Sequence, residues 1–331
     1  MRAVLCQGWG GPEFLKLVDV PPPPVGSGQV RLTVAAAGLN FADTLMIAGK
    51  YQEKPAFPFS PGLEVAGTVE EIGAGVTGLV PGQRVAAVLD HGGFAEQTIA
   101  RAEDVFPIPE AMEFAVAAGF PIAYGTSHIA LWDRARLKAG EILLVHGAAG
   151  GVGLTAVEIG KALGATVIAS AHGKDRITVA AAHGADHLID TQNEDIRERV
   201  RELTGGRGVD VVFDPVGGET FDKSLRSIAW GARLLVIGFA SGTTPQIPAN
   251  LLLVKNCAAI GLYWGSYRRH APALVAESFR ALFAWFDQGK LKPLVSQQFP
   301  LDRAAEALGL LANRRATGKL VLTMQPETSA P

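Results

Sequence analysis

The chain has 331 residues, of which 48% are hydrophobic and 19% charged, and its formal net charge is −2. This composition excludes a disordered chain, and the near-zero charge gives no sign of the basic surface that nucleic-acid or membrane binding requires. The length is comfortable for two domains.

The chain begins with an apolar strand pattern at Met1–Leu5, not with a signal peptide, and no apolar run is long enough to span a bilayer. We therefore expect a cytoplasmic protein. Cys6 and Cys257 lie far apart in apolar segments and are expected as buried thiols; a disulfide is possible, but nothing in the sequence supports one.

The first third of the chain has the alternating pattern of half-buried strands. Gln29–Ala36, Glu64–Gly73 and Arg84–Val88 each alternate apolar and polar residues, and Gly and Pro separate them. The stretch Pro21–Pro24 indicates a stiff extended linker. Several short strands with turns between them predict a small barrel or sandwich.

From Ile142 onward, apolar strands alternate with amphipathic helices, which predicts a doubly wound parallel sheet. The expected strands are Ile142–His146, Thr166–Ala169, His187–Ile189, Val209–Phe213 and Arg233–Gly238. Helical patterns between them include Ile177–His183 and Asp195–Thr204, and the mixed charges of Arg197–Glu202 predict a solvated helix surface.

The rhythm of strand and helix ends after Gly261. A helix is expected at Pro272–Gln288, a strand at Gln297–Phe299, a helix at Leu301–Asn313 and a strand at Lys319–Thr323. We expect the chain to return here to its first domain. The predicted domains are therefore residues 1–122 with 262–331, and residues 123–261.

The stretch Gly147-x-x-Gly150-x-x-Gly153 is the strongest functional signal. It follows the strand Glu141–Val145 and precedes a helical pattern at Leu154–Leu163. Glycines at such a turn let the backbone approach a dinucleotide pyrophosphate, and the helix N-terminus offers free N–H groups. The alternative is a tight turn that binds nothing.

The end of the second strand indicates which nucleotide binds. NAD-preferring dehydrogenases place an acidic residue there to accept hydrogen bonds from the ribose 2′-OH. This chain has Ser170 at that point, no acid before Asp175, and two cations, Lys174 and Arg176. Since a 2′-phosphate would pair with these cations, the sequence favours NADP(H). Alternatively, they are ordinary surface cations of a first helical turn.

The whole set of motifs resembles a medium-chain dehydrogenase/reductase of the quinone oxidoreductase (zeta-crystallin-like) branch. The matching segments are Gly10–Glu13, Ala36–Thr44, Pro61–Gly67, Pro81–Val85, Tyr124–Thr126, the glycine turn, Asp214–Gly218 and Arg315–Lys319. The resemblance implies an α/β fold with a GroES-like β-rich catalytic domain, built from both chain ends, around a Rossmann domain.

The residues that bind zinc in metal-dependent relatives are missing. Asn40 stands where those relatives have a catalytic cysteine, and Leu63 stands where they have a histidine. Neither is a credible zinc ligand, and two cysteines cannot form the four-cysteine structural site. We therefore expect no metal.

Without zinc, substrates that accept hydride easily remain, such as quinones and alkenes conjugated to a carbonyl. The favoured function is an NADPH-dependent quinone reductase. The alternatives are a 2-alkenal or enoyl-thioester reductase, and a low-turnover NADPH-binding protein with a structural or sensing role.

Two candidate catalytic residues follow from the resemblance. It places Asn40 beside the nicotinamide, where its amide orients a substrate oxygen; the alternative is a turn residue that bonds its own loop. Tyr51 is expected to bond a quinone oxygen or donate a proton, or else only to line the cleft. Leu45 replaces a second pocket tyrosine, so the pocket is expected to be more apolar than in relatives.

Cofactor contacts also follow from the resemblance. Thr126 is expected at the nicotinamide end, unless it serves as a helix N-cap. Backbone N–H groups for the pyrophosphate are expected from Ala149, Gly150, Gly151 and Val152. The expected surroundings of the 2′-phosphate are Ser170, Gly173, Lys174, Arg176 and Arg315, and the loop Gly238, Phe239 and Ala240 is expected to hold the carboxamide.

Two further expectations concern surfaces. Tyr263–Gly265 either closes the pocket or builds a subunit contact. The resemblance also implies a homodimer, formed through the edge strand Ala258–Leu262, whose apolar edge would otherwise be exposed.

Overall fold

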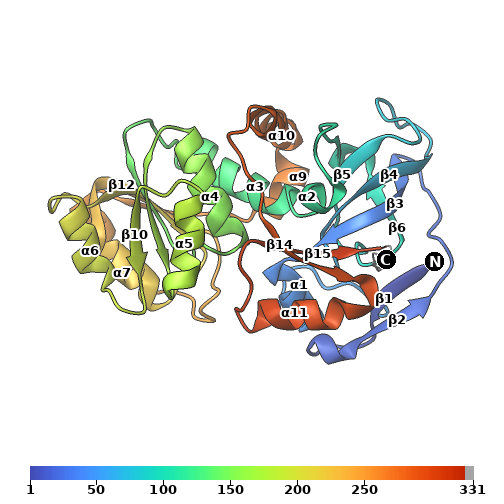
Figure 1. Ribbon diagram of the computed structural model, residues 1–331, viewed down its shortest axis with the longest axis horizontal. Helices are drawn as coiled ribbons and strands as arrows, with labels where there is room; N and C mark the ends of the chain where they lie inside the picture. Colours follow the sequence, from blue (N-terminus) through green and yellow to red (C-terminus); the bar gives the residue numbers. More distant parts are fainter. Residues whose placement is uncertain (325–331) are drawn as a thin grey trace, which may run out of the picture. The chain divides into compact units, whose positions relative to one another are not determined.

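The computed structural model describes residues 1–324, and residues 325–331 lie outside the described part. The chain forms two compact units (Figure 1). The first joins Met1–Ile122 to the chain from Pro293 onward, and the second is Ala123–Lys292. The prediction of an α/β protein whose two chain ends share one β-rich domain is confirmed.

The first unit is built around a mostly antiparallel sheet in the order β14-β15-β3-β4-β5-β7, with β6 paired to β3. β3 buries alternate side chains over most of its length, as the sequence pattern predicts, whereas β4 and β5 each bury four consecutive residues and do not alternate. The strands of the unit are β1 (Arg2–Cys6), β2 (Leu15–Asp19), β3 (Gln29–Gly38), β4 (Glu64–Ile72), β5 (Arg84–Val88), β6 (Gln97–Arg101), β7 (Val105–Pro107), β14 (Val295–Pro300) and β15 (Lys319–Thr323).

Short helices join these strands and close the core of the first unit. They are α1 (Phe41–Ile47), α2 (Phe114–Ala118) and α11 (Ala304–Ala312), with 3-10 turns at Pro12–Phe14, Ala102–Asp104 and Leu301–Arg303. The returning segment β14–α11–β15 contributes Phe299, Leu308 and Leu322 to the same apolar core as the N-terminal strands.

The second unit is a six-stranded parallel sheet in the order β10-β9-β8-β11-β12-β13. Numbered within the unit, this is the order 3-2-1-4-5-6 of doubly wound dinucleotide-binding domains. The strands are β8 (Ile142–Val145), β9 (Thr166–Ala171), β10 (His187–Asp190), β11 (Val209–Asp214), β12 (Ile228–Val236) and β13 (Ala258–Gly261).

The helices of the second unit largely match the predicted ones. They are α3 (Pro121–His128), α4 (Gly151–Ala162), α5 (Lys174–Ala182), α6 (Ile196–Leu203), α7 (Glu219–Ser227), α8 (Ala249–Lys255), α9 (Tyr267–His270) and α10 (Pro272–Asp287), with a π-helical segment at Ile129–Arg134 and a 3-10 turn at Trp264–Ser266. β12 begins at Ile228, earlier than predicted, because its pairing with β11 shifts register between Val209 and Val211.

The boundary predicted at residue 262 differs from the structure, where the second unit extends to Lys292. The physical reason is the packing of α10. Ser278 on this helix hydrogen-bonds the buried His128 of α3 (2.9 Å), and Phe279 packs its ring against Trp264. The helix therefore completes the core of the second unit before the chain returns to the first.

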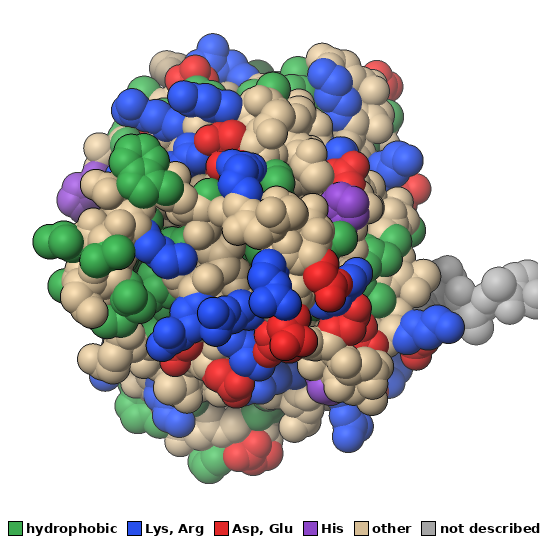
Figure 2. Space-filling view, turned by 90° about the vertical axis from the view of Figure 1, so that its left-hand side faces the viewer, with side chains coloured by type: hydrophobic (Ala, Val, Ile, Leu, Met, Phe, Trp, Pro, Cys, Tyr) green, Lys and Arg blue, Asp and Glu red, His purple; other side chains and the backbone are tan. Residues whose placement is uncertain are grey.

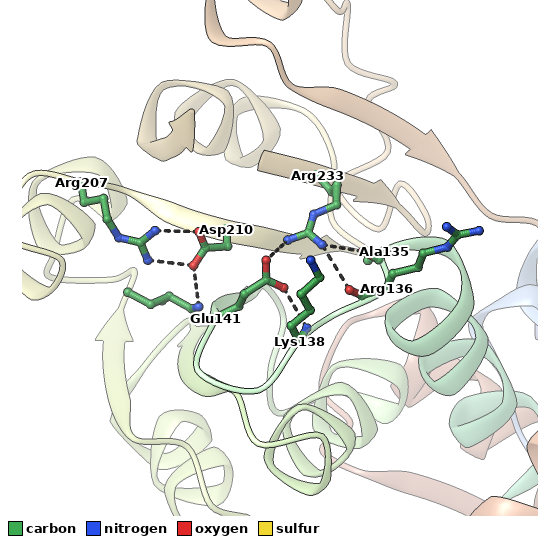
Figure 3. Close-up of polar contacts among 8 residues, drawn as sticks. Ala135, Arg136, Lys138, Glu141, Arg207, Asp210 and Arg233 are labelled. Carbon is green, nitrogen blue, oxygen red and sulfur yellow. Dashed lines mark hydrogen bonds and ion pairs between the residues drawn. The ribbon is translucent and has the colours of Figure 1, made fainter. Parts of the chain in front are cut away.

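A polar network ties the amino ends of the parallel strands together (Figure 3). Arg233 of β12 pairs with Glu141 and donates to the carbonyl oxygen of Ala135 at 2.6 Å. Arg207 grips both carboxylate oxygens of Asp210, which also accepts the N–H of Ile142. The network lies at the end of the sheet opposite the glycine turn. It therefore stabilises the fold and is not part of the nucleotide site.

A hollow of about 770 Å³ lies between α6 and α7. Figure 2, which faces this side, shows basic and acidic side chains intermixed, and both kinds line the hollow. The mixture agrees with the prediction of a solvated helix surface. Cys6 and Cys257 are both free thiols, and Cys257 is only half-buried. Within residues 1–324, no helix has the length and apolar character needed to cross a membrane.

Candidate functional site

The glycine turn joins β8 to α4 as the sequence predicts. Gly147 has a left-handed backbone (φ 57°), and its carbonyl oxygen accepts the N–H of Gly150 at 2.9 Å. α4 begins at Gly151, so the N–H groups of Gly151 and Val152 belong to its first turn and have no partner within the helix. Together with the dipole of a 12-residue helix, they form a site suited to an anion.

The turn refines the predicted pyrophosphate contacts. The N–H of Gly150 is used inside the turn, so this residue serves as the helix N-cap and not as a free donor. Ala149 is buried beside it. Within residues 1–324, the N–H groups of the other three predicted donors, Ala149, Gly151 and Val152, make no backbone hydrogen bond, so their contacts with the pyrophosphate stay a prediction.

His146, immediately before the turn, fixes Ser170 in place. Its Nδ1 lies 2.6 Å from Ser170 Oγ, and its Nε2 lies 2.6 Å from Ser224 Oγ. Ser224 Oγ donates its single proton to the carbonyl oxygen of Thr220, so it accepts from His146 Nε2–H. His146 Nδ1 then accepts the proton of Ser170, consistent with a neutral ring, because burial lowers the pKa of His146.

The predicted 2′-phosphate loop follows β9. Gly173 (φ 93°) precedes α5, which begins at Lys174; Lys174 is exposed and Arg176 is half-buried. The hydroxyl proton of Ser170 is donated to His146, so the hydroxyl has no proton left to donate to a phosphate. The predicted contact of Ser170 with the 2′-phosphate stays a prediction.

Asp190, which the sequence reasoning missed, anchors this loop. Its carboxylate accepts from the N–H groups of Gln192 and Gly173 and from the side chain of Asn193. These hydrogen bonds, from Gln192 and Gly173 first, lower the pKa of Asp190. The signal that could have found it is an acidic residue at the last position of a strand.

Two loops meet at the carboxyl ends of β11 and β12. The Ala240 N–H donates to Pro215 O at 3.0 Å, and Phe239 is exposed beside Gly217. The structure thus brings the predicted Gly238–Ala240 loop next to Asp214–Gly218. Asp214 Oδ1 accepts two backbone N–H groups, whereas its buried Oδ2 has no partner within residues 1–324.

Thr126 is buried inside α3, so it is not a helix N-cap. Its neighbour Ser127 lies 2.9 Å from Val152 O and 2.8 Å from Thr155 Oγ1, which ties α3 to the first turns of α4. Trp264 is buried against Gly125, and its Nε1 has no partner in the described chain. Trp264 therefore packs inside the second unit, while Tyr263 is exposed.

In the first unit, Asn40 lies at the start of α1. Its N–H donates to Asp43 Oδ2 at 2.7 Å, and its side-chain Nδ2 donates to Glu64 Oε1 at 2.9 Å. Lys319 Nζ donates to Asn40 Oδ1 and to Glu64 Oε1, both at 2.8 Å. The side chain of Asn40 is thus held by two charged groups, and Asn40 also forms a capping box with Asp43 in its own loop.

Glu64 and Lys319 were missed as site residues, although both lie in motifs that carry the resemblance. Each is a buried charge at the first position of its strand, β4 or β15, and apolar residues follow it directly. That pattern was the available signal, since buried charges occur almost only in pairs. Of the other predicted residues, Tyr51 is half-buried against the core, and Arg315 is exposed after α11.

Asp43 is fully buried beside this cluster. Burial raises the pKa of Asp43 to about 7, although the N–H groups of Asn40 and Gly62 and the charge of Lys319 oppose the rise. The folded protein therefore binds this proton more tightly than the unfolded chain does. The stabilisation is full below the ordinary pKa near 3.8 and is lost as the pH rises to about 7.

We expect Asp43→Asn to remove this pH dependence. The unfolding free energy of the wild type relative to the variant should fall by roughly 2 to 3 kcal/mol between pH 5 and pH 8. Urea unfolding of both proteins at the two pH values measures the change, and the comparison cancels other titrating groups. Parallel pH profiles for the two proteins would contradict the assignment.

Two family models match the chain. The alcohol dehydrogenase GroES-like domain matches residues 26–110, and the zinc-binding dehydrogenase model matches residues 151–284. Zinc does not fit the residues present, because Leu63 has no donor atom and the Lys319 ammonium already occupies Asn40 Oδ1 and Glu64 Oε1. Within residues 1–324, no group of three or more His, Cys, Asp or Glu is placed to hold a metal.

Similar proteins cover almost the whole chain. "Quinone oxidoreductase-like protein 2 homolog" of Nematostella vectensis is 42% identical over 97% of this chain and 88% of its own length. "Quinone oxidoreductase" of Homo sapiens is 33% identical, over 98% of both chains. The structure of Escherichia coli quinone oxidoreductase complexed with NADPH superposes with a TM-score of 0.92 at 30% identity, over 98% of this chain and 100% of that one. The chain therefore belongs to the quinone oxidoreductase (zeta-crystallin-like) family of medium-chain dehydrogenases/reductases.

Proposed function

We propose that this protein is an NADPH-dependent reductase that transfers hydride, without a metal, to quinones or similar conjugated carbonyl acceptors. The observation that carries the proposal is the carboxyl edge of the parallel sheet in the second unit. There the glycine turn, the loop with Lys174 and Arg176, and Asp214 Oδ2, which has no partner within residues 1–324, lie at the ends of neighbouring strands. Open parallel sheets bind nucleotides at this position.

The residues present fit NADP(H). Gly151 and Val152 would hold the pyrophosphate through first-turn N–H groups, and Lys174 and Arg176 would pair with the 2′-phosphate. The orphaned Asp214 oxygen accepts hydrogen bonds, and ribose hydroxyls are donors of the right kind. NADPH-bound structures of similar proteins, such as the one from Escherichia coli, support the same choice.

When bound, the cofactor supplies a hydride, and the protein supplies position and charge. We assign Asn40 to hold the oxygen of the acceptor and Tyr51 to line the acceptor site or donate a proton. The ammonium of Lys319 binds the side-chain oxygens of Asn40 and Glu64, which a metal would need as ligands. This supports chemistry without zinc. A cytoplasmic homodimer formed through β13, an edge strand of the sheet, completes the proposal.

Stopped-flow mixing of NADPH-loaded protein with 1,4-benzoquinone, 9,10-phenanthrenequinone and crotonaldehyde tests the function. We expect rapid oxidation of NADPH by the quinones and slower oxidation by crotonaldehyde. Faster reaction with crotonaldehyde would indicate an alkenal reductase instead. Tight NADPH binding without oxidation by any acceptor would contradict both enzymes, and stoichiometric zinc in the purified protein would contradict the metal-free mechanism.

A further inference from the structure

The buried ammonium of Lys319 has no proton left for a substrate. Its three hydrogens go to the carbonyl oxygen of Leu39 at 2.7 Å, to Asn40 Oδ1 at 2.8 Å and to Glu64 Oε1 at 2.8 Å. An ammonium group has three donors and no acceptor, so this set uses all of them. Any effect of Lys319 on a bound substrate must therefore pass through a neighbour.

Both carboxylate oxygens of Glu64 also accept hydrogen bonds. Its Oε1 accepts from Lys319 and Asn40, and its Oε2 accepts the N–H of Ile122 in the first turn of α3 at 2.8 Å. The side chain is fully buried, and the opposite charge of Lys319 lies at hydrogen-bond distance. The pair is therefore a neutral, fixed frame around Asn40.

This frame decides which way the amide of Asn40 points. An ammonium group only donates and a carboxylate only accepts, so Oδ1 must face Lys319 and Nδ2 must face Glu64. The flipped amide would set its NH₂ against the ammonium and its oxygen against the carboxylate. Two charge-assisted hydrogen bonds would be lost at once.

One hydrogen of Asn40 Nδ2 remains after these bonds are made. Within the described chain, Nδ2 makes a single hydrogen bond, to Glu64. The side chain is thus a donor with one free N–H, while its oxygen already faces a cation.

We propose that Lys319 and Glu64 are positioning residues that lock Asn40 as a hydrogen-bond donor to the carbonyl oxygen of the acceptor. The proposal rests on the proposed function and extends it, because it specifies what Asn40 recognises: an oxygen that gains negative charge as hydride arrives. A donor fixed in advance stabilises that charge without reorganising during the reaction.

A kinetic cycle tests the lock. Because removing one buried charge leaves the other unpaired, the main variant is Lys319→Met/Glu64→Gln, which removes both. We expect its kcat with 1,4-benzoquinone to fall roughly tenfold, with the Kd for NADPH unchanged within about twofold. Asn40→Ala should lose a similar factor, and combining all three substitutions should cost no more than either set alone.

A purely structural role of the pair predicts a different result. The losses would then multiply in the combined variant, or the Lys319→Met/Glu64→Gln enzyme would keep the kcat of the wild type; either outcome would overturn the proposal. Lys319→Arg retains the charge and should recover most of the activity. Lys161→Met, which removes a half-buried partner of Asp186, is the matched control and should leave kcat unchanged.

A second measurement does not depend on turnover. The side-chain amide of Asn40 should give two distinct ¹H–¹⁵N signals, one hydrogen protected from exchange by Glu64 and one not, identified by their loss in Asn40→Asp. In Lys319→Met/Glu64→Gln this protection should disappear. An unprotected amide in the wild type would refute the lock, whereas absence of NADPH oxidation by the wild type with a protected amide would refute only the proposed function.

Discussion

Gly153→Ala is expected to raise the Kd for NADPH at least about 100-fold, which corresponds to roughly 2.7 kcal/mol of binding free energy. A Cβ on Gly153 would lie 2.2 Å from the carbonyl oxygen of Gly147 and 2.7 Å from its carbon. Both are backbone atoms of the turn itself, so no flexible side chain can move aside. The turn must open, and opening it displaces the first-turn N–H groups of α4.

The same substitution should lower the unfolding free energy by a few kcal/mol, because the clash forces the first turn of α4 away from the turn that joins it to β8. Fluorescence titration with NADPH and urea unfolding measure the two effects separately. If Gly153→Ala folds and binds NADPH within about threefold of the wild type, the turn is not where the nucleotide is held.

Gly309→Ala is the matched control for the glycine substitution. Gly309 is also helical, in α11, but a Cβ there meets no atom of residues 1–324 within 4 Å. Alanine is favoured over glycine in a helix, so this variant should gain about 0.5 to 1 kcal/mol of stability. Its Kd for NADPH should stay unchanged, which would show that the loss at Gly153 comes from the clash.

The glycine turn could be predicted because everything that defines it is local. A buried strand, three spaced glycines and an amphipathic helix follow one another within about two dozen residues. The alternation of strands and helices also predicted the parallel sheet. The position of α10 could not be predicted this way, since its place depends on contacts of Ser278 and Phe279 with residues far away in sequence.

The surroundings of Asn40 show more clearly what could not be predicted from the sequence. The sequence marks Asn40 by what is missing there, a zinc ligand. Instead, the side chains that contact the side-chain amide of Asn40 are Glu64 of β4 and Lys319 of β15. Lys319 is separated from Asn40 by 279 positions in the sequence. Only the pairing of β15 with β3, and of β3 with β4, brings the three side chains together. No local sequence pattern predicts the register in which these strands pair.

The loop after β9 could be predicted from the sequence only in part. Its cations were readable from the sequence, but the carboxylate that holds it, Asp190, belongs to the next strand. Similarly, Ser170 occupies the predicted position, yet His146 takes its proton. The sequence thus located the nucleotide edge, while the roles of individual side chains depend on pairing between strands.

Removing the cations of this loop should change which nucleotide binds. We expect Lys174→Ala/Arg176→Ala to raise the Kd for NADPH roughly 100-fold and to leave the Kd for NADH within about twofold. Each charge-assisted hydrogen bond to the 2′-phosphate is worth about 1.5 kcal/mol or more, and NADH has no such phosphate. Asp190 remains beside Gly173 in the variant, so its negative charge would then oppose the phosphate without compensation.

The salt dependence separates the two cations. Lys174 is exposed, so its contribution should weaken as salt is raised, whereas half-buried Arg176 should be screened less. Titrations with NADPH and NADH at about 0.05 and 0.5 M salt, on each single variant and the pair, measure this. Lys161→Ala, which removes a half-buried cation of α4 paired with Asp186, is the control and should change neither Kd. Equal weakening of NADPH and NADH would mean that the cations shape the loop, and an unchanged NADPH affinity would mean that the 2′-phosphate is held elsewhere.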